Sequence, residues 1–161
     1  IRRRGMVYRG FVFIGLIEVD GDPFVIEYNC RMGDPETEVV LPRLNNDLVA
    51  LFQALAEGSL DQVVVEEAAL AATTVMLVSG GYPGDYEKGK VISGLDEVSG
   101  SLVFHAGTQQ KEGAIVTNGG RVLAITTCAE NFEEALSVSL ENAAKIDFEN
   151  KYFRKDIGFD L

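Results

Sequence analysis

The chain has 161 residues, 47% hydrophobic and 24% charged, which is the composition of a globular protein of one or two small domains. Its net charge of −11 and sequence pI of about 4.5 exclude a broad basic surface for nucleic acid. A single histidine excludes a multi-histidine metal site. No apolar run approaches the roughly 20 residues that cross a bilayer, and no signal peptide is visible.

Two apolar, β-rich runs come first in the chain, at Phe11–Val19 and Phe24–Arg31. The link Asp20–Pro23 has the residues of a tight turn, in which Asp-Gly supplies positive φ angles. The pattern therefore predicts an antiparallel hairpin near the N-terminal end of the sequence.

Three polar side chains, Glu27, Asn29 and Arg31, would share one face of the second strand, because side chains alternate along a strand. A carboxylate and an amide oxygen at this spacing suit one Mg²⁺ ion. A guanidinium one step further suits a phosphate or a developing negative charge. The plainer interpretation is an exposed strand with a polar face. The break at 33–36 (Gly-Asp-Pro-Glu) favours a functional site, since loops at strand ends commonly carry function.

Helix signals follow the hairpin. Residues 36–41 are expected to begin a short helix. Asp47 is a typical N-cap for a helix over 48–57, and Gly58 is a typical residue for its end. An acidic, alanine-rich bridge then precedes a change to strand periodicity.

The second half of the chain is predicted to be rich in strands, at 73–78, 101–105, 114–117 and 121–127. Asn118–Gly120 would join the last two of these as a hairpin turn. Asn131, with Glu134 three residues later, predicts the start of a helix that runs to about Ile146. The tail, Tyr152–Asp160, is expected to pack back on the sheet.

Two further motifs invite a chemical interpretation. Gly84–Val91 is close to a phosphate-binding loop, but Val91 replaces the Ser or Thr that holds Mg²⁺, and no helix signal follows. A loop that shapes a substrate pocket and a plain surface turn both remain open. His105 ends a predicted strand beside a glycine turn, where a structural role is the commoner one.

Taken together, these motifs resemble the C-terminal part of the phosphoribosylamine–glycine ligase family, ATP-grasp enzymes of de novo purine biosynthesis. The resemblance runs nearly end to end. It is most specific at Val25–Glu38 (VIEYNCRMGDPETE) and Gly81–Tyr86 (GYPGDY). It continues through Tyr8–Phe11, His105–Thr108 and Arg154–Gly158.

The resemblance implies the chemistry of the site. Glu27 and Asn29 would bind the Mg²⁺ or Mn²⁺ that bridges the phosphates of ATP, the co-substrate. Arg31 would be the catalytic residue that stabilises charge during phosphoryl transfer. Glycine would be activated as glycyl phosphate and attacked by the amine of 5-phosphoribosylamine. The residues implied in substrate binding are Asp34, Glu36, Tyr82, Pro83 and Gly84.

The resemblance also implies the architecture, an α+β fold. Residues 1–60 would be the C-terminal half of an ATP-grasp lobe, with antiparallel strands and a helix. Residues 61–72 would be a linker. Residues 73–161 would form a small, mostly antiparallel β domain with a packed helix.

Two departures from the family pattern matter. Many relatives place another metal-binding carboxylate where this chain has Gly15, and Glu18 would lie on the opposite face. The chain also begins as a piece of something longer, so we expect it to be inactive by itself. Its exposed strand edge is then expected to self-associate.

The remaining expectations concern setting and alternatives. Cys30 and Cys128 lack metal-ligand spacing, which indicates two reduced thiols in a cytoplasmic protein. Small molecules are the expected partners, and neither nucleic acid nor a membrane is. Another ATP-grasp carboxylate–amine ligase of purine synthesis is one alternative. A binding module that retains half of an ATP-grasp site without catalysis is the other.

Overall fold

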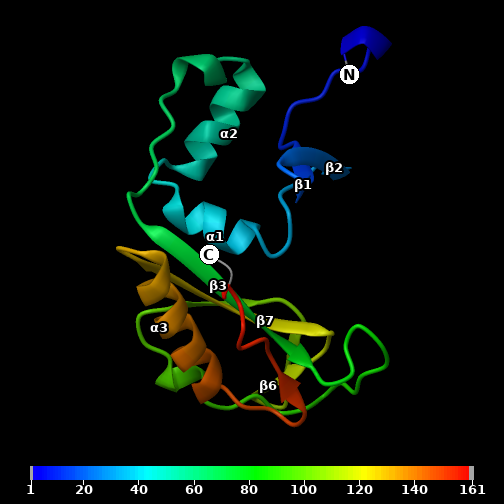
Figure 1. Cartoon of the computed structure of the whole chain (residues 1–161), viewed down its shortest axis with the longest axis vertical. Coiled ribbons are helices and arrows are strands. Elements are labelled where there is room, and N and C mark those ends of the chain that lie inside the picture. Colours follow the sequence, from blue (N-terminus) through cyan, green and yellow to red (C-terminus); the bar gives the residue numbers. More distant parts are fainter. Residues whose placement is uncertain (1, 160–161) are drawn as a thin grey trace. The chain divides into compact units, whose positions relative to one another are not determined.

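The computed structural model describes residues 2–159, and the chain divides into two compact units. The first unit holds the residues up to Thr37 together with Leu44–Ala68. The second holds Glu38–Arg43 and the residues from Ala69 onward. Runs of antiparallel strands and separate helices make up the chain (Figure 1), which confirms the expected α+β class. Within 2–159, no helix is long and apolar enough to cross a membrane.

The first unit is built on an antiparallel hairpin of β1 (Phe13–Val19) and β2 (Asp22–Asn29), as predicted. Asp20 and Gly21 form its turn with φ angles of 54° and 86°, the positive pair that matches the twist of a hairpin. The prediction that Arg31 lies on this strand is wrong. The ladder ends at the pair of Phe13 and Asn29, where β1 itself begins, so Arg31 lies two residues beyond it.

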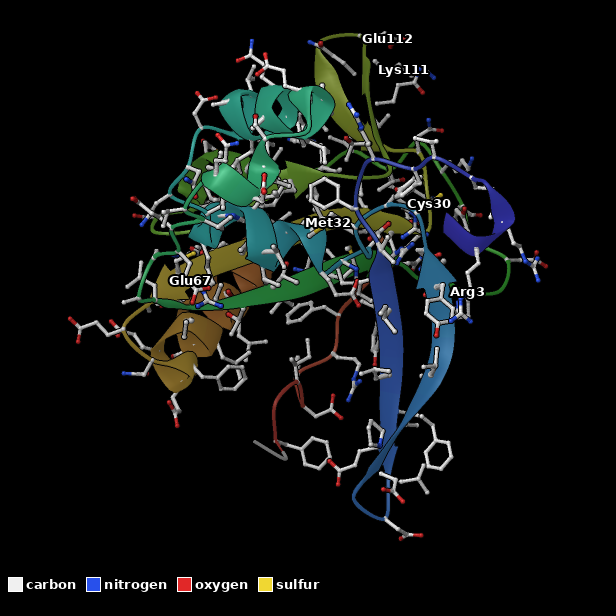
Figure 2. All side chains as sticks on the ribbon, turned by 90° about the horizontal axis from the view of Figure 1, so that it is seen from above. Arg3, Cys30, Met32, Glu67, Lys111 and Glu112 are labelled. Carbon is white, nitrogen blue, oxygen red and sulfur yellow. The ribbon has the colours of Figure 1, made fainter. Side chains whose placement is uncertain are left out.

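Both faces of the hairpin carry exposed apolar side chains (Figure 2). Its large apolar side chains are between 48% and 69% exposed: Ile14, Leu16, Ile17, Val19, Phe24, Val25, Ile26 and Tyr28. A two-stranded sheet buries little on its own. The hairpin therefore presents the kind of surface that ordinarily lies inside a protein.

Helix α2 (Leu48–Glu57) has the ends that its sequence predicts. The Asp47 carboxylate accepts a hydrogen bond from the Ala50 amide at 2.8 Å, and Gly58 ends the helix with a φ of 80°. Helix α1 (Thr37–Val40) is short, as expected, and continues into η2 (Leu41–Arg43). The 3-10 turns η1 (Arg2–Arg4) and η3 (Leu60–Gln62) complete this half of the chain.

The second unit is an antiparallel sheet with the strand order β4-β7-β3-β8. Its strands are β3 (Ala71–Ser79), β4 (Leu102–His105), β7 (Arg121–Ala129) and β8 (Lys151–Tyr152). Helix α3 (Phe132–Lys145) lies along β3 and β7 (Figure 1), and η4 (Leu95–Glu97) precedes β4. The tail pairs with the sheet through β8, as expected, although Asp160 lies outside the described residues.

One predicted connection is wrong. Strand β6 (Ala114–Thr117) does not form a hairpin with β7 but pairs with β5 (Thr108–Lys111), a strand that the sequence did not predict. Glu112 and Gly113 make the actual hairpin turn, with φ angles of 52° and 84°. Asn118–Gly120 instead carries the chain from one sheet to the other.

The core of the second unit lies between α3 and the sheet. Asn131 caps α3, accepting a hydrogen bond from the Glu134 amide at 2.8 Å, as its sequence predicts. The buried core residues are Val75, Leu77, Ile92, Val122, Leu123, Ile125, Ala143, Ile146 and Phe148. Two polar residues of α3, Ser139 and Asn142, are also buried.

A chain of hydrogen bonds ties these polar residues to the sheet. Ser139 Oγ lies 3.0 Å from Thr73 Oγ1 and donates to Thr127 Oγ1 at 2.8 Å. Thr127 Oγ1 lies 2.7 Å from Ser101 Oγ, to which Asn142 Nδ2 donates at 2.8 Å. The helix is thus held to the sheet by directional contacts as well as by apolar packing.

Candidate functional site

Glu27 and Asn29 lie side by side at the end of β2. Asn29 Nδ2 donates a hydrogen bond to Glu27 Oε1 at 2.8 Å, so the two side chains share one face of the strand, as the sequence predicts. Asn29 is half-buried, whereas Glu27 is exposed. The pair brings a carboxylate and an amide group together at the edge of solvent.

This pair fits a hard divalent cation such as Mg²⁺ in its chemistry. Both side chains carry oxygen ligands, and rotating the Asn29 amide by half a turn would direct its oxygen to the place where its nitrogen now lies. Across the ladder, Gly15 pairs with Glu27, and a Cβ at Gly15 would lie 3.1 Å from Glu27 Cγ. Within residues 2–159, no three His, Cys, Asp or Glu side chains gather to hold a metal. Among the described residues, Glu27 and Asn29 are therefore the candidate pair of ligands.

The segment after β2 folds back tightly. Arg31 Nη1 donates to the Met32 carbonyl at 2.8 Å, and the hydroxyl of Thr37 donates to the Gly33 carbonyl at 2.6 Å. The Glu36 carboxyl group packs on Gly33, where a Cβ would come within 2.8 Å of its Cδ. Asp34 is exposed at the turn. The structure thus brings Arg31, Asp34 and Glu36 into one loop that continues from Glu27 and Asn29.

Tyr82, Pro83 and Gly84 lie in the second unit, in the loop that follows β3. Ser79 fastens the start of this loop to the 118–120 turn: its amide donates to the Gly120 carbonyl at 2.8 Å and its hydroxyl to the Gly119 carbonyl at 2.9 Å. The Tyr82 ring packs on Gly120, where a Cβ would come within 2.9 Å of its Cγ. Tyr82 also meets Tyr86 edge-to-face at 6.2 Å.

A second glycine contact joins the His105–Thr108 segment to the same turn. A Cβ on Gly107 would lie 2.7 Å from Gly119 Cα, so the two backbones touch. His105 Nδ1 lies 2.9 Å from Thr108 Oγ1, and its ring is exposed. The loop after β3, the His105–Thr108 segment and the 118–120 turn therefore meet at one end of the four-stranded sheet.

The basic end of this loop is fixed by ion pairs rather than arranged as a phosphate-binding loop. Lys90 Nζ lies 2.6 Å from Glu87 Oε2 and 2.9 Å from Glu149 Oε1. The hydrogen bond and charge of Lys90 lower the pKa of Glu87, and the two carboxylates raise the pKa of Lys90. The described residues between Lys90 and β4 hold the 3-10 turn η4 and no α-helix, in agreement with the sequence.

Sequence reasoning did not predict that Tyr8 contacts the segment between Asn29 and Arg31. Its hydroxyl lies 2.9 Å from the carbonyl oxygen of Cys30, the residue between Asn29 and Arg31. The signal was present in the Tyr8–Phe11 motif, but nothing in the local pattern says which carbonyl a tyrosine 22 residues away will reach.

Comparison with known proteins gives consistent results. The profile of one family, described as "Phosphoribosylglycinamide synthetase, C domain", matches residues 72–160. The phosphoribosylamine–glycine ligase of Chlorobaculum tepidum is 47% identical over 98% of this chain, and that of Vibrio vulnificus (strain CMCP6) is 49% identical over 96%. The crystal structure of the Thermotoga maritima phosphoribosylamine–glycine ligase superposes with a TM-score of 0.84 at 41% identity, over 96% of this chain.

These relatives are much longer than this chain. The matched region makes up 38% of the Chlorobaculum protein, 37% of the Vibrio protein and 38% of the Thermotoga chain. The similarity thus concerns less than two-fifths of each of these proteins.

Proposed function

Because the chain belongs to the phosphoribosylglycinamide synthetase family through its C domain, we propose that it is the C-terminal portion of a phosphoribosylamine–glycine ligase. The whole enzyme would join glycine to 5-phosphoribosylamine with ATP as co-substrate. The observation that carries the proposal is the Glu27–Asn29 pair, joined at 2.8 Å in a chain 47% identical to such a ligase.

In this proposal the glycine carboxylate attacks the γ-phosphorus of ATP, giving glycyl phosphate and ADP. The amine of phosphoribosylamine then attacks the acyl carbon and phosphate leaves. A divalent ion held by Glu27 and Asn29 would neutralise phosphate charge. Arg31, whose guanidinium has five donors, would stabilise the transferring phosphoryl group. Asp34 and Glu36 would hold a cationic amine.

The loop at Tyr82–Gly84 would form part of the substrate pocket. The contacts at both ends of this loop support the proposal. Hydrogen bonds from Ser79 to Gly119 and Gly120 fix its start. Ion pairs of Lys90 with Glu87 and Glu149 fix its end. A loop held at both ends can present side chains with little loss of entropy on binding.

Setting and partners follow from the same proposal. Both Cys30 and Cys128 are free thiols, which supports a cytoplasmic enzyme. As an isolated chain, the protein would self-associate through the hairpin, since β1 and β2 form a two-stranded sheet with two apolar faces.

The test is a chimera. The part of the Chlorobaculum tepidum ligase that precedes the matched region is joined to this chain, and ADP release is measured with ATP and Mg²⁺. We expect release that needs both glycine and phosphoribosylamine. A folded chimera without this activity, beside an active native relative, would overturn the proposal. Turnover with other carboxylates in place of glycine would point to another ligase of the class.

The chain alone provides the second arm of this test. We expect no ATP turnover by residues 1–161 with glycine and phosphoribosylamine, since the matched region is 38% of the relative's length. ADP release above that of a Glu27→Ala chain would contradict the requirement for the rest of the enzyme.

A further inference from the structure

The segment Tyr8–Phe11 touches the two other main elements of the first unit. At one end, the Tyr8 hydroxyl lies 2.9 Å from the Cys30 carbonyl oxygen, just past β2. At the other end, the Phe11 ring meets Phe52 of α2 edge-to-face at 6.0 Å. Between them, Arg9 Nη1 donates to the Ala56 carbonyl of α2. We call this segment, residues 8–11, the clasp.

Gly10 makes the clasp possible. Its φ of +152° is rare for residues with a side chain, and a Cβ there would lie 2.8 Å from the Tyr8 hydroxyl oxygen. The hydroxyl also lies 2.6 Å from the Phe11 carbonyl oxygen, so its single hydrogen is shared between Phe11 and Cys30. The segment is therefore folded tightly around this hydroxyl.

The carbonyl that Tyr8 contacts belongs to Cys30, which lies between two candidate site residues, Asn29 and Arg31. The β1–β2 ladder ends at Asn29, so the peptide between Cys30 and Arg31 lies beyond it. Figure 2 labels Cys30 and Met32 at this end of the strand. Whatever orients the Cys30 carbonyl orients the backbone between Asn29, a candidate metal ligand, and Arg31, the candidate phosphate-binding residue.

We propose that Tyr8 is a positioning residue for phosphoryl transfer: by holding the Cys30 carbonyl, it fixes Asn29, the candidate metal ligand, together with Arg31. The proposal rests on the function proposed above. It predicts that loss of the hydroxyl changes the requirement for the metal, whereas a contact that only stabilises the fold would change the amount of active enzyme.

The first experiment examines the contact in the 161-residue chain. Tyr8→Phe removes one oxygen atom, and Tyr28→Phe is the matched control, because Tyr28 lies on β2 with 69% of its surface exposed. We expect the carbonyl ¹³C resonance of Cys30 to move upfield in Tyr8→Phe and to stay in place in Tyr28→Phe. An unchanged Cys30 resonance in Tyr8→Phe would overturn the contact and the proposal.

The second experiment measures the rate of the chimera against Mg²⁺ concentration. In Tyr8→Phe we expect the half-saturating Mg²⁺ concentration to rise about tenfold, because the released Cys30 peptide no longer orients the neighbouring Asn29; this is the lower end of the effect of losing a group that orients a metal ligand. Gly10→Ala, which pushes the hydroxyl aside while keeping Tyr8, should give the same direction of change. Tyr28→Phe should leave the value unchanged.

The outcomes separate the two proposals. A Tyr8→Phe chimera that loses kcat but keeps the Mg²⁺ half-saturation of Tyr28→Phe would show a purely structural role and overturn the positioning role. An inactive unsubstituted chimera would overturn the proposed function, and the positioning role of Tyr8 with it. The Cys30 resonance decides the contact in either case.

Discussion

At the scale of single residues, the charge on Glu27 distinguishes it from its neighbour Asn29. In the active chimera, Glu27→Ala should lower kcat by on the order of 10³-fold, because several kcal/mol of transition-state stabilisation depend on a charged ligand. Asn29→Ala should cost far less, since an amide supplies only a dipole. Arg31→Lys should also be damaging, because an ammonium cannot reproduce the guanidinium fork. Steady-state kinetics at saturating Mg²⁺ provides the comparison.

Cys30→Ala is the control for this series. The Cys30 side chain is exposed, and Tyr8 contacts its backbone oxygen rather than its thiol. Its kcat should therefore stay near that of the parent. If Cys30→Ala abolished activity in a folded protein while Glu27→Ala did not, the assignment of Glu27 as a metal ligand would be wrong.

The pKa of Glu87 reports its ion pair with Lys90 in the loop that follows β3. The Lys90 hydrogen bond lowers the pKa of its carboxyl group, so the pair stabilises the fold above the ordinary pKa of Glu and loses this effect as the pH falls through the lowered value. Lys90→Met should move the Glu87 titration midpoint upward in a ¹³C carboxyl NMR titration. Lys88→Met, a neighbouring change of the same kind, should leave it in place; equal shifts in both would contradict the pairing.

The residues of the site show what a sequence can predict. Glu27 and Asn29 were placed together correctly because strand periodicity is local. Arg31 was placed on the strand wrongly, because the end of β2 depends on where β1 begins, at Phe13. The contact from Tyr8 to Cys30 was missed, since it spans 22 residues and depends on the unusual backbone of Gly10.

At the scale of elements, the buried hydroxyl of Ser139 connects α3 to the sheet. Ser139→Ala should lower the free energy of unfolding by about 1–3 kcal/mol, because it leaves the hydroxyls of Thr73 and Thr127 short of a partner. Ser137→Ala, an exposed change on the same helix, makes the same gain in helix propensity and should stay within about 0.5 kcal/mol of the parent. Urea unfolding of both variants measures the difference; equal stabilities would contradict the role.

Elements with local signals were predicted well, and those that depend on distant pairing were not. The N-caps Asp47 and Asn131 placed α2 and α3 correctly. Strand β5 is polar along its length (Thr-Gln-Gln-Lys), and β8 is only two residues long, so neither has a strand pattern of its own. The error at Asn118–Gly120 has the same cause: a turn-forming sequence does not say whether the chain pairs or crosses between sheets.

At the scale of the whole molecule, the exposed hairpin should control association. We expect sedimentation velocity of the chain to show mass that increases with concentration. Ile26 is 64% exposed on the hairpin. Ile26→Lys places a charge there and should weaken association at least tenfold. Val64→Lys adds the same charge at a residue outside the hairpin, 75% exposed, and should not. A strictly monomeric parent at high concentration would contradict the proposal.

The contact between Tyr82 and Gly120 has a spectroscopic consequence. The Tyr82 ring lies where a side chain on Gly120 would begin, so the α protons of Gly120 lie within the magnetic field of an aromatic ring. The chain contains no tryptophan whose larger ring current would obscure this effect. The Gly120 proton resonances therefore report, without any label, whether the loop from Tyr82 is seated, and a ligand that lifts the ring would return them to their ordinary positions.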